Sequence, residues 1–171
     1  MNIAIFGLPG SGKTYFAKQF ALKINALHLS SDAVRKDMLQ MGHYEEQAKS
    51  TVYEAMLQLM EKANKKQQNV VLDATFNKRH IRNLFIEKSR ELHHQLYFIE
   101  IKADESVIRE RLRHQRPDSE ADFGVYLKIK EEFEQIEEDH LVLNSDKESL
   151  NEMLYKAVVY IKNLSDDTTR N

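Results

Sequence analysis

The stretch IAIFGLPGSGKTYF, Ile3 to Phe16, joins an apolar run to a glycine-rich loop and then to residues with helical spacing. Ile3–Phe6 is continuously apolar and is followed by glycine, which predicts a buried β-strand. Beyond the loop, Phe16 and Phe20 lie four residues apart, as they would on the inward face of a helix. Strand, glycine-rich loop and helix in this order predict an α/β fold.

The loop in this stretch matches the pattern G-x-x-x-x-G-K-[ST] of a P-loop. Glycines let successive backbone N–H groups turn toward one point, and the following helix adds its positive end, so the loop suits phosphate groups. Lys13 can reach the terminal phosphates of ATP, and the Thr14 hydroxyl can ligate Mg²⁺. A glycine-rich turn that binds nothing is the alternative. The predicted ATP-binding residues here are Gly7, Leu8, Pro9, Gly10, Ser11, Gly12, Lys13 and Thr14.

Short apolar runs alternate with helical patterns along the rest of the chain. Strands are expected at 27–29, 69–74, 95–101 and 140–143, and helices at 13–23, 44–66, 81–92, 106–115, 122–138 and 150–164. Because the strand runs are continuous rather than alternately polar and apolar, they predict a parallel sheet with helices on both faces. We expect one three-layer α/β/α domain over residues 1–164 and a disordered polar tail at 165–171.

The composition excludes several classes of protein. The 171 residues, 42% hydrophobic and 30% charged, suit one domain with its own core. The net charge of −2 argues against a basic coat for nucleic acid, although a local basic patch is compatible with it. The chain has no cysteine and therefore no disulfide or thiolate chemistry. Without a leader or an apolar run of roughly 20 residues, a cytoplasmic protein is expected.

Asp73 ends the β-branched run NVVLDA and is the candidate for a second magnesium contact. In the P-loop template for phosphoryl transfer, a strand-terminal aspartate contacts Mg²⁺, usually through water, while the loop hydroxyl ligates it. The alternative is a carboxylate that accepts backbone N–H bonds at the turn. Histidines offer no rival metal site, because His93 and His94 diverge on a helix and no other pair has i, i+4 spacing. All seven are read as surface or core-edge residues.

Asp32 and Arg35 lie in the segment SSDAVR, directly after the second expected strand. Ligands of an open parallel sheet bind beyond the carboxyl ends of its strands, which places Asp32 at the mouth of the site. Its carboxylate can accept the proton of an attacking hydroxyl, and Arg35 can bind an anionic part of the acceptor. The alternative is a surface ion pair on a helix capped by Ser30 or Ser31.

An arginine-rich segment, RERLRHQRPDSE, begins at Arg109. Arg109, Arg113 and Arg116 share one helix face, and Pro117 then breaks the helix. A basic stripe that runs into a breaker suits a lid that closes over phosphates and stabilises transferred charge. Arg113 and Arg116 are therefore expected to contact ATP, with Arg116 catalytic because it adjoins the break. The alternative is a solvated arginine face paired with nearby glutamates.

Four segments together resemble a known group of proteins: GLPGSGKT, SSDAVRKDM, VVLDATFNKRHIR and RERLRHQRPDSEADFGVYLKIKEEFE. They are similar to the P-loop kinases grouped around the 5′-kinase domain of polynucleotide kinases, which include stand-alone predicted ATP-binding kinases of the AAA-domain type. Zeta-toxin and chloramphenicol phosphotransferase-like kinases are more distantly similar. The resemblance spans residues 3–145 and implies a five-stranded sheet of order 2-3-1-4-5.

The resemblance also implies roles for particular residues. It implies a catalytic base at Asp32, an acceptor-binding arginine at Arg35, a lid arginine at Arg116, and adenine-side contacts from Asn144 and Ser145. The nucleic-acid-binding kinases of this group tend to show a basic channel. A nucleic-acid acceptor is therefore compatible with the resemblance but is not supported by the net charge of −2.

These residues predict a phosphotransferase with an alcohol group as acceptor. Mg²⁺-ATP would donate its γ-phosphoryl group to a hydroxyl activated by Asp32, while Lys13, Thr14 and Arg116 stabilise the charge. A 5′-OH nucleic acid, a nucleoside or another small metabolite could be the acceptor, and no obligate protein partner is inferred. The alternative is a switch ATPase without a phosphorylated product. That class needs a residue that positions water, and residues 74–77 contain no glutamine or glutamate.

Overall fold

The computed structural model describes residues 1–38, 46–113 and 121–168, with the side chains of all of these except 46–49 and 166–168. Five strands form one parallel sheet of order β2-β3-β1-β4-β5. They are β1 (Asn2–Phe6), β2 (Leu27–Ser30), β3 (Val70–Asp73), β4 (Leu96–Lys102) and β5 (His140–Asn144). The predicted α/β P-loop fold and the strand order 2-3-1-4-5 are confirmed.

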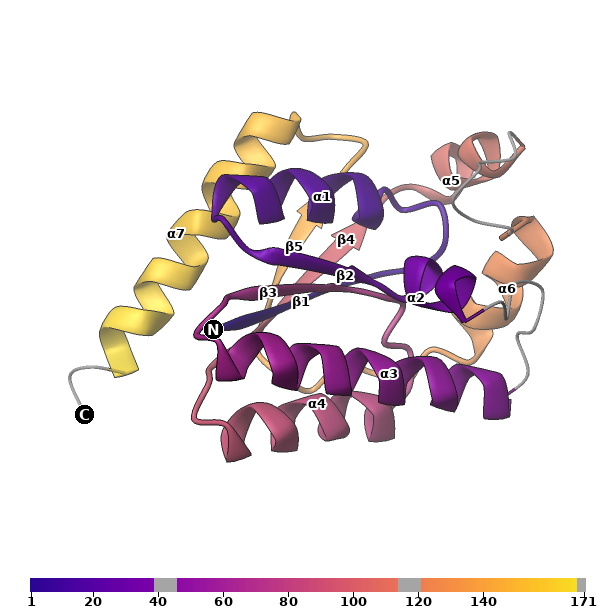
Figure 1. Ribbon diagram of the computed structural model, residues 1–171. Coiled ribbons are helices and arrows are strands. Elements are labelled where there is room, and N and C mark those ends of the chain that lie inside the picture. Colours follow the sequence, from indigo (N-terminus) through magenta and orange to yellow (C-terminus); the bar gives the residue numbers. More distant parts are fainter. Residues whose placement is uncertain (39–45, 114–120, 169–171) are drawn as a thin grey trace.

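Helices cover both faces of this sheet (Figure 1). On one face lie α1 (Lys13–Lys23) and α7 (Leu150–Thr168), and on the other lie α3 (Glu46–Lys65) and α4 (Arg79–Glu91). The short helices α2 (Ser31–Asp37), α5 (Glu105–Leu112) and α6 (Phe123–Glu131) gather at the carboxyl end of the strands. Parallel strands need crossover connections, which are usually helices. The helices that cover the two faces of the sheet leave its carboxyl end accessible to a ligand.

Strand β1 separates two apolar clusters at the centre of the sheet. Its side chains alternate: Ile3 and Ile5 pack with Phe16 of α1, whereas Ala4 and Phe6 face α3 and α4. All five of these side chains are at most 1% exposed. Burial of each large side chain stabilises the fold by roughly 1.5–3 kcal/mol. The loop that follows Phe6 is thus anchored to the most buried strand.

The helix predicted at 122–138 is wrong in its second half, because α6 ends at Glu131. Residues 133–139, here called the strap, run across the α3–α4 side of the sheet without helical structure. The Phe133 ring stacks on Phe6 with centroids 6.5 Å apart, and the Glu134 N–H donates to the Asn77 carbonyl at 2.9 Å. Backbone bonds to the loop after β3 therefore replace the helical bonds that the sequence pattern predicted.

Two further boundaries differ from the expected ones. Helix α7 continues to Thr168, so residues 165–168 of the expected tail are helical, and 169–171 lie outside the described residues. At the start of this extension the Ser165 hydroxyl donates back to the Ile161 carbonyl at 2.8 Å. Helix α5 ends at Leu112 with Arg113 as its C-cap, and residues 114–115 of its expected range are also outside the described residues. Within the described ranges, no helix is long and apolar enough to span a membrane.

Candidate functional site

The loop between β1 and α1 has a positive φ at each of its three glycines, a backbone that glycine adopts without strain. Gly7 has φ +145°, and a Cβ there would lie 2.4 Å from the Ile101 carbonyl oxygen of β4. Gly12 has φ +93° and precedes the first residue of α1, Lys13. The free N–H groups of the first turn of α1 therefore open toward the loop, as an anion site requires.

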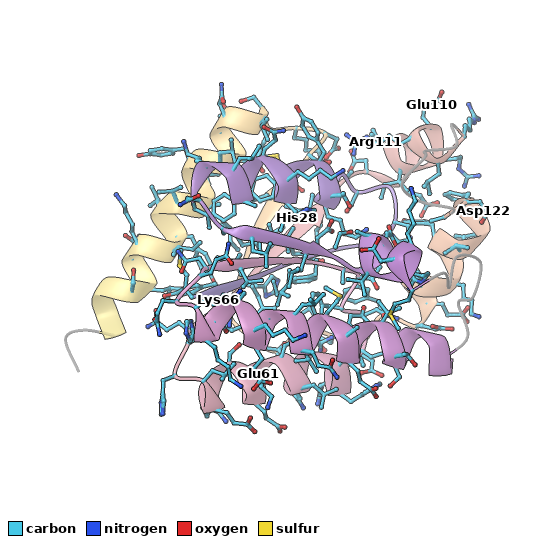
Figure 2. All side chains as sticks on the ribbon, in the orientation of Figure 1. His28, Glu61, Lys66, Glu110, Arg111 and Asp122 are labelled. Carbon is cyan, nitrogen blue, oxygen red and sulfur yellow. The ribbon has the colours of Figure 1, made fainter. Side chains whose placement is uncertain are left out.

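Arg111 of α5 binds the outer side of this loop, a contact that the sequence did not predict. Its guanidinium donates to the carbonyl oxygens of Gly10 and Ser11, each at 3.3 Å, and to the hydroxyl and carbonyl of Ser145 at 2.8 and 3.2 Å. The Ser145 hydroxyl itself donates to Ser11 O at 2.5 Å. Arg111 thus joins the phosphate loop to the loop after β5 (Figure 2). By binding these carbonyls, Arg111 and Ser145 fix the backbone of the loop.

Arg111→Ala is expected to weaken ATP binding about tenfold. The variant loses the hydrogen bonds from the guanidinium to the loop, and hydrogen bonds to a charged group contribute about 1.5–3 kcal/mol. Part of the binding energy of ATP would then be used to order the loop. Isothermal titration calorimetry with AMPPNP measures this change. Arg90→Ala, which removes an exposed arginine of α4, is the control and should bind as the wild type does. Unchanged affinity in Arg111→Ala would mean that the loop holds its shape without the guanidinium.

Of the predicted lid arginines, the two that the structure describes make other contacts. Arg109 stacks on the Phe123 ring of α6, with its guanidinium carbon 3.9 Å from the ring centroid. Arg113 is exposed and pairs with Glu110 at 2.6 Å. Arg116 lies outside the described residues. The proposed contacts of Arg113 and Arg116 with ATP stay predictions.

Asp73 ends β3 beside the phosphate loop. In the ladder it stands opposite Ile5 of β1 and Ser30 of β2, and Val71, two residues earlier, packs in the cluster beneath α1. The Asp73 side chain therefore faces α1, where Thr14 occupies the first turn. One of its oxygens, Oδ2, lies 3.3 Å from His28 Nε2.

The second oxygen of Asp73, Oδ1, is buried and has no hydrogen-bond partner within the described residues. A buried carboxylate oxygen without a donor is costly, and a hydrated magnesium ion would supply what it lacks. The described ranges hold no group of three His, Cys, Asp or Glu side chains that could bind a metal alone. Thr14 and Asp73 therefore fit an Mg²⁺ ion that takes its other ligands from water and from nucleotide phosphates.

Asp32 and Arg35 form an ion pair in α2, with Arg35 Nη1 3.0 Å from Asp32 Oδ1. The pair is not a solvated surface pair, because Arg35 is only 7% exposed. Burial raises the pKa of Asp32 above its ordinary value, whereas the charges of Lys13 and Arg35 oppose this and the Asp73 carboxylate adds to it. The Asp32 carboxylate therefore lies within electrostatic reach of Lys13, Arg35 and Asp73 at the carboxyl end of the sheet. Ser30 is the N-cap of α2, but its side chain makes no capping bond.

A second group of contacts fixes the loop that follows Asp73. Phe76 in this loop has φ +48°, an uncommon value for a non-glycine residue. Its N–H donates to the Tyr53 hydroxyl at 3.3 Å, and its carbonyl accepts from Arg82 Nη1 at 3.1 Å. The Tyr53 hydroxyl also lies 3.3 Å from Thr75 Oγ1, and burial raises the pKa of Tyr53. Helices α3 and α4 thus hold the loop beside the Asp32–Arg35 pair.

Several solved structures have the same fold as this chain. The crystal structure of a gluconokinase from Sinorhizobium meliloti 1021 gives a TM-score of 0.75 at 18% identity over 98% of this chain and 95% of that one. The APS kinase CysC of Mycobacterium tuberculosis, in complex with AMPPNP and APS, gives 0.73 at 14% identity over 94% and 96%. Kti12 of Chaetomium thermophilum, in complex with ADP-AlF3, gives 0.69 at 16% identity over 92% and 97%.

At these identities the likeness shows the fold alone. No curated protein matches the sequence. The family model described as AAA domain, AAA_33, matches residues 3–136, which is most of the chain and includes the phosphate loop, Asp32, Arg35 and Asp73. The chain belongs to this family of AAA domains.

Proposed function

We propose that the protein is an ATP-dependent kinase that transfers the γ-phosphoryl group of Mg²⁺-ATP to a hydroxyl of a small molecule. The observation that carries this proposal is the placement of Asp32, which is half-buried at the carboxyl end of the sheet, pairs with Arg35 and lies within electrostatic reach of Lys13 of the phosphate loop. A carboxylate beside the terminal phosphate suits a base that orients an attacking hydroxyl.

The described site residues form two groups, one for ATP with its magnesium ion and one for the acceptor. The loop N–H groups and Lys13 hold the β- and γ-phosphates, and Thr14 and Asp73 hold the magnesium ion, which neutralises charge on the phosphates when bound. Asp32 accepts the proton of the acceptor hydroxyl. Arg35 is buried beside Asp32 and can neutralise an anionic group of the acceptor.

Charge pairing favours a small acceptor over a nucleic acid. The basic residues at the start of α4 each have a carboxylate of the strap as partner: Lys78 with Glu134 at 3.6 Å, Arg79 with Glu137 at 2.5 Å, and Arg82 with Glu138 at 3.3 Å. Phosphate contacts by such cations provide most of the affinity for a nucleic-acid backbone. Arg82 is buried, and the glutamates beside the more exposed Lys78 and Arg79 lower the positive potential that a nucleic-acid backbone would meet there. The gluconokinase and the APS kinase are named for small hydroxyl compounds, which agrees with this choice.

The test is transfer of label from γ-labelled ATP with Mg²⁺. Pools of sugars, sugar acids and nucleosides serve as acceptors, beside 5′-OH DNA and RNA oligonucleotides. Lys13→Ala, purified in the same way, controls for contaminating kinases. We expect label on a small molecule. Label on the oligonucleotides would instead indicate a polynucleotide kinase, and release of free phosphate alone would indicate the switch ATPase.

A further inference from the structure

We propose that His28 is a positioning residue that orients Asp73 toward the magnesium ion, an inference that rests on the proposed function. No role for a histidine follows from the P-loop pattern. The carboxylate Oδ2 of Asp73 lies 3.3 Å from His28 Nε2, while Oδ1 is buried and has no partner within the described residues. One oxygen is therefore held, and the other is left for the metal.

Strand register explains how His28 reaches Asp73. His28 stands opposite Val71 in the β2–β3 ladder, and Asp73 follows Val71 by two residues, so both side chains project on the α1 face of the sheet. A diagonal neighbour of this kind lies within reach of a long side chain. Figure 2 labels His28 on the sheet, on the side of α1. The imidazole therefore approaches the carboxylate from the edge strand, away from the phosphate loop.

The chemistry of the contact fixes the orientation of the carboxylate. Asp73 is 1% exposed, so its carboxylate depends on neighbouring side chains rather than on bulk water for its hydrogen bonds. With a proton on Nε2, the imidazole donates to Oδ2 and prevents rotation of the carboxylate about its Cβ–Cγ bond. Partners of metal-ligating carboxylates in other sites act in this way, and their loss costs about 10–100-fold in metal affinity or activity. The same magnitude is expected here.

Two polar variants separate positioning from packing. His28→Gln keeps an N–H donor near the place of Nε2, whereas the shorter amide of His28→Asn cannot reach Asp73. His80→Gln, on the exposed start of α4, is the matched control. The probe is Mn²⁺, titrated into the complex of protein and AMPPNP and followed by electron paramagnetic resonance. Calorimetry with AMPPNP in EDTA measures the part of nucleotide binding that needs no metal.

We expect His28→Asn to bind Mn²⁺ about 10–100-fold more weakly, with AMPPNP affinity in EDTA unchanged. His28→Gln should retain most of the Mn²⁺ affinity. Wild-type Mn²⁺ affinity in His28→Asn would overturn the proposal, as would an equal loss of affinity with and without metal, or a loss in His28→Gln as large as in His28→Asn. If the wild type transfers no phosphoryl group yet the Mn²⁺ result is as expected, the positioning role stands and the kinase proposal fails.

Discussion

Asp32→Asn is expected to reduce phosphoryl transfer about 10²- to 10⁴-fold while ATP binds nearly as tightly as before. The amide has the size of the carboxylate and can still accept a hydrogen bond from Arg35, but it cannot take the proton of the acceptor. Single-turnover transfer and AMPPNP calorimetry measure the two quantities separately. Persistence of transfer at the wild-type rate would show that another group, or water, accepts the proton.

The pH dependence gives a second test of the same residue. Transfer needs the ionised carboxylate, and burial raises the pKa of Asp32 above its ordinary value. The acidic limb of kcat/KM should therefore lie at a higher pH than an ordinary aspartate gives, and it should be absent from the residual rate of Asp32→Asn. If both proteins show the acidic limb at the same pH, the limb reports the ionisation of a group other than Asp32.

Linkage predicts the effect of this variant on stability. The raised pKa means that the folded state holds the Asp32 proton to a higher pH than the unfolded state does. The free energy of unfolding falls as the pH rises from the pKa of Asp32 in the unfolded chain through its pKa in the folded protein, because ionisation of Asp32 is more favourable in the unfolded chain. Asp32→Asn is free of this loss and should unfold at neutral pH at a temperature no lower than the wild type. A lost transfer rate would then reflect chemistry rather than unfolding.

Arg82→Met is expected to destabilise the fold by about 3–5 kcal/mol, because it takes a common donor from the buried Phe76 carbonyl, the part-buried Gln135 carbonyl and the half-buried Glu138 carboxylate. Arg82 is 0% exposed. It donates to Phe76 O at 3.1 Å, to Gln135 O at 2.8 Å and to Glu138 at 3.3 Å, and so joins the loop after β3 to the strap. Urea unfolding followed by circular dichroism measures the loss.

Arg79→Met, three residues earlier on α4, is the control for this substitution. Its guanidinium also pairs with a strap carboxylate, Glu137, but the pair is exposed and should contribute less than about 1 kcal/mol. The double variant Arg82→Met with Glu138→Gln should recover part of the loss, because the buried charge is removed with its partner. Equal effects of Arg79→Met and Arg82→Met would show that burial does not govern these pairs.

The fold could be predicted largely because its strands are buried on both faces. A run such as VVLD in β3 is apolar without alternation only where helices cover both sides of the sheet. The strap could not be predicted in the same way. Phe133 and Ile136 are spaced as on a helix and do pack on the core, but they do so from a segment without helical structure. Its backbone bonds go to Asn77 and Arg82, which are more than 50 residues away in the sequence.

The positions of site residues that directly follow a strand could be predicted, because the carboxyl ends of parallel strands meet at one edge of the sheet. Asp32 and Asp73 both lie at the carboxyl end of the sheet as expected. Arg111 and His28 were not recognised, since each acts on a partner that is distant in sequence. Arg111 lies outside the stripe of Arg109 and Arg113, so helical periodicity gave it no special place. Its role depends on two carbonyls, Gly10 O and Ser11 O, which carry no side-chain signal.

The position of a strand in the sheet predicts how readily the part of the site that follows this strand unfolds locally. β1 is paired on both sides and leads directly into the phosphate loop, whereas β2 is an edge strand paired only with β3 and leads into α2 with Asp32 and Arg35. Local unfolding begins where pairing and packing are weakest. In amide hydrogen exchange, β2 and α2 should therefore lose protection before β1 does. The half that would receive the acceptor can then fluctuate while the half that would hold the nucleotide keeps its shape.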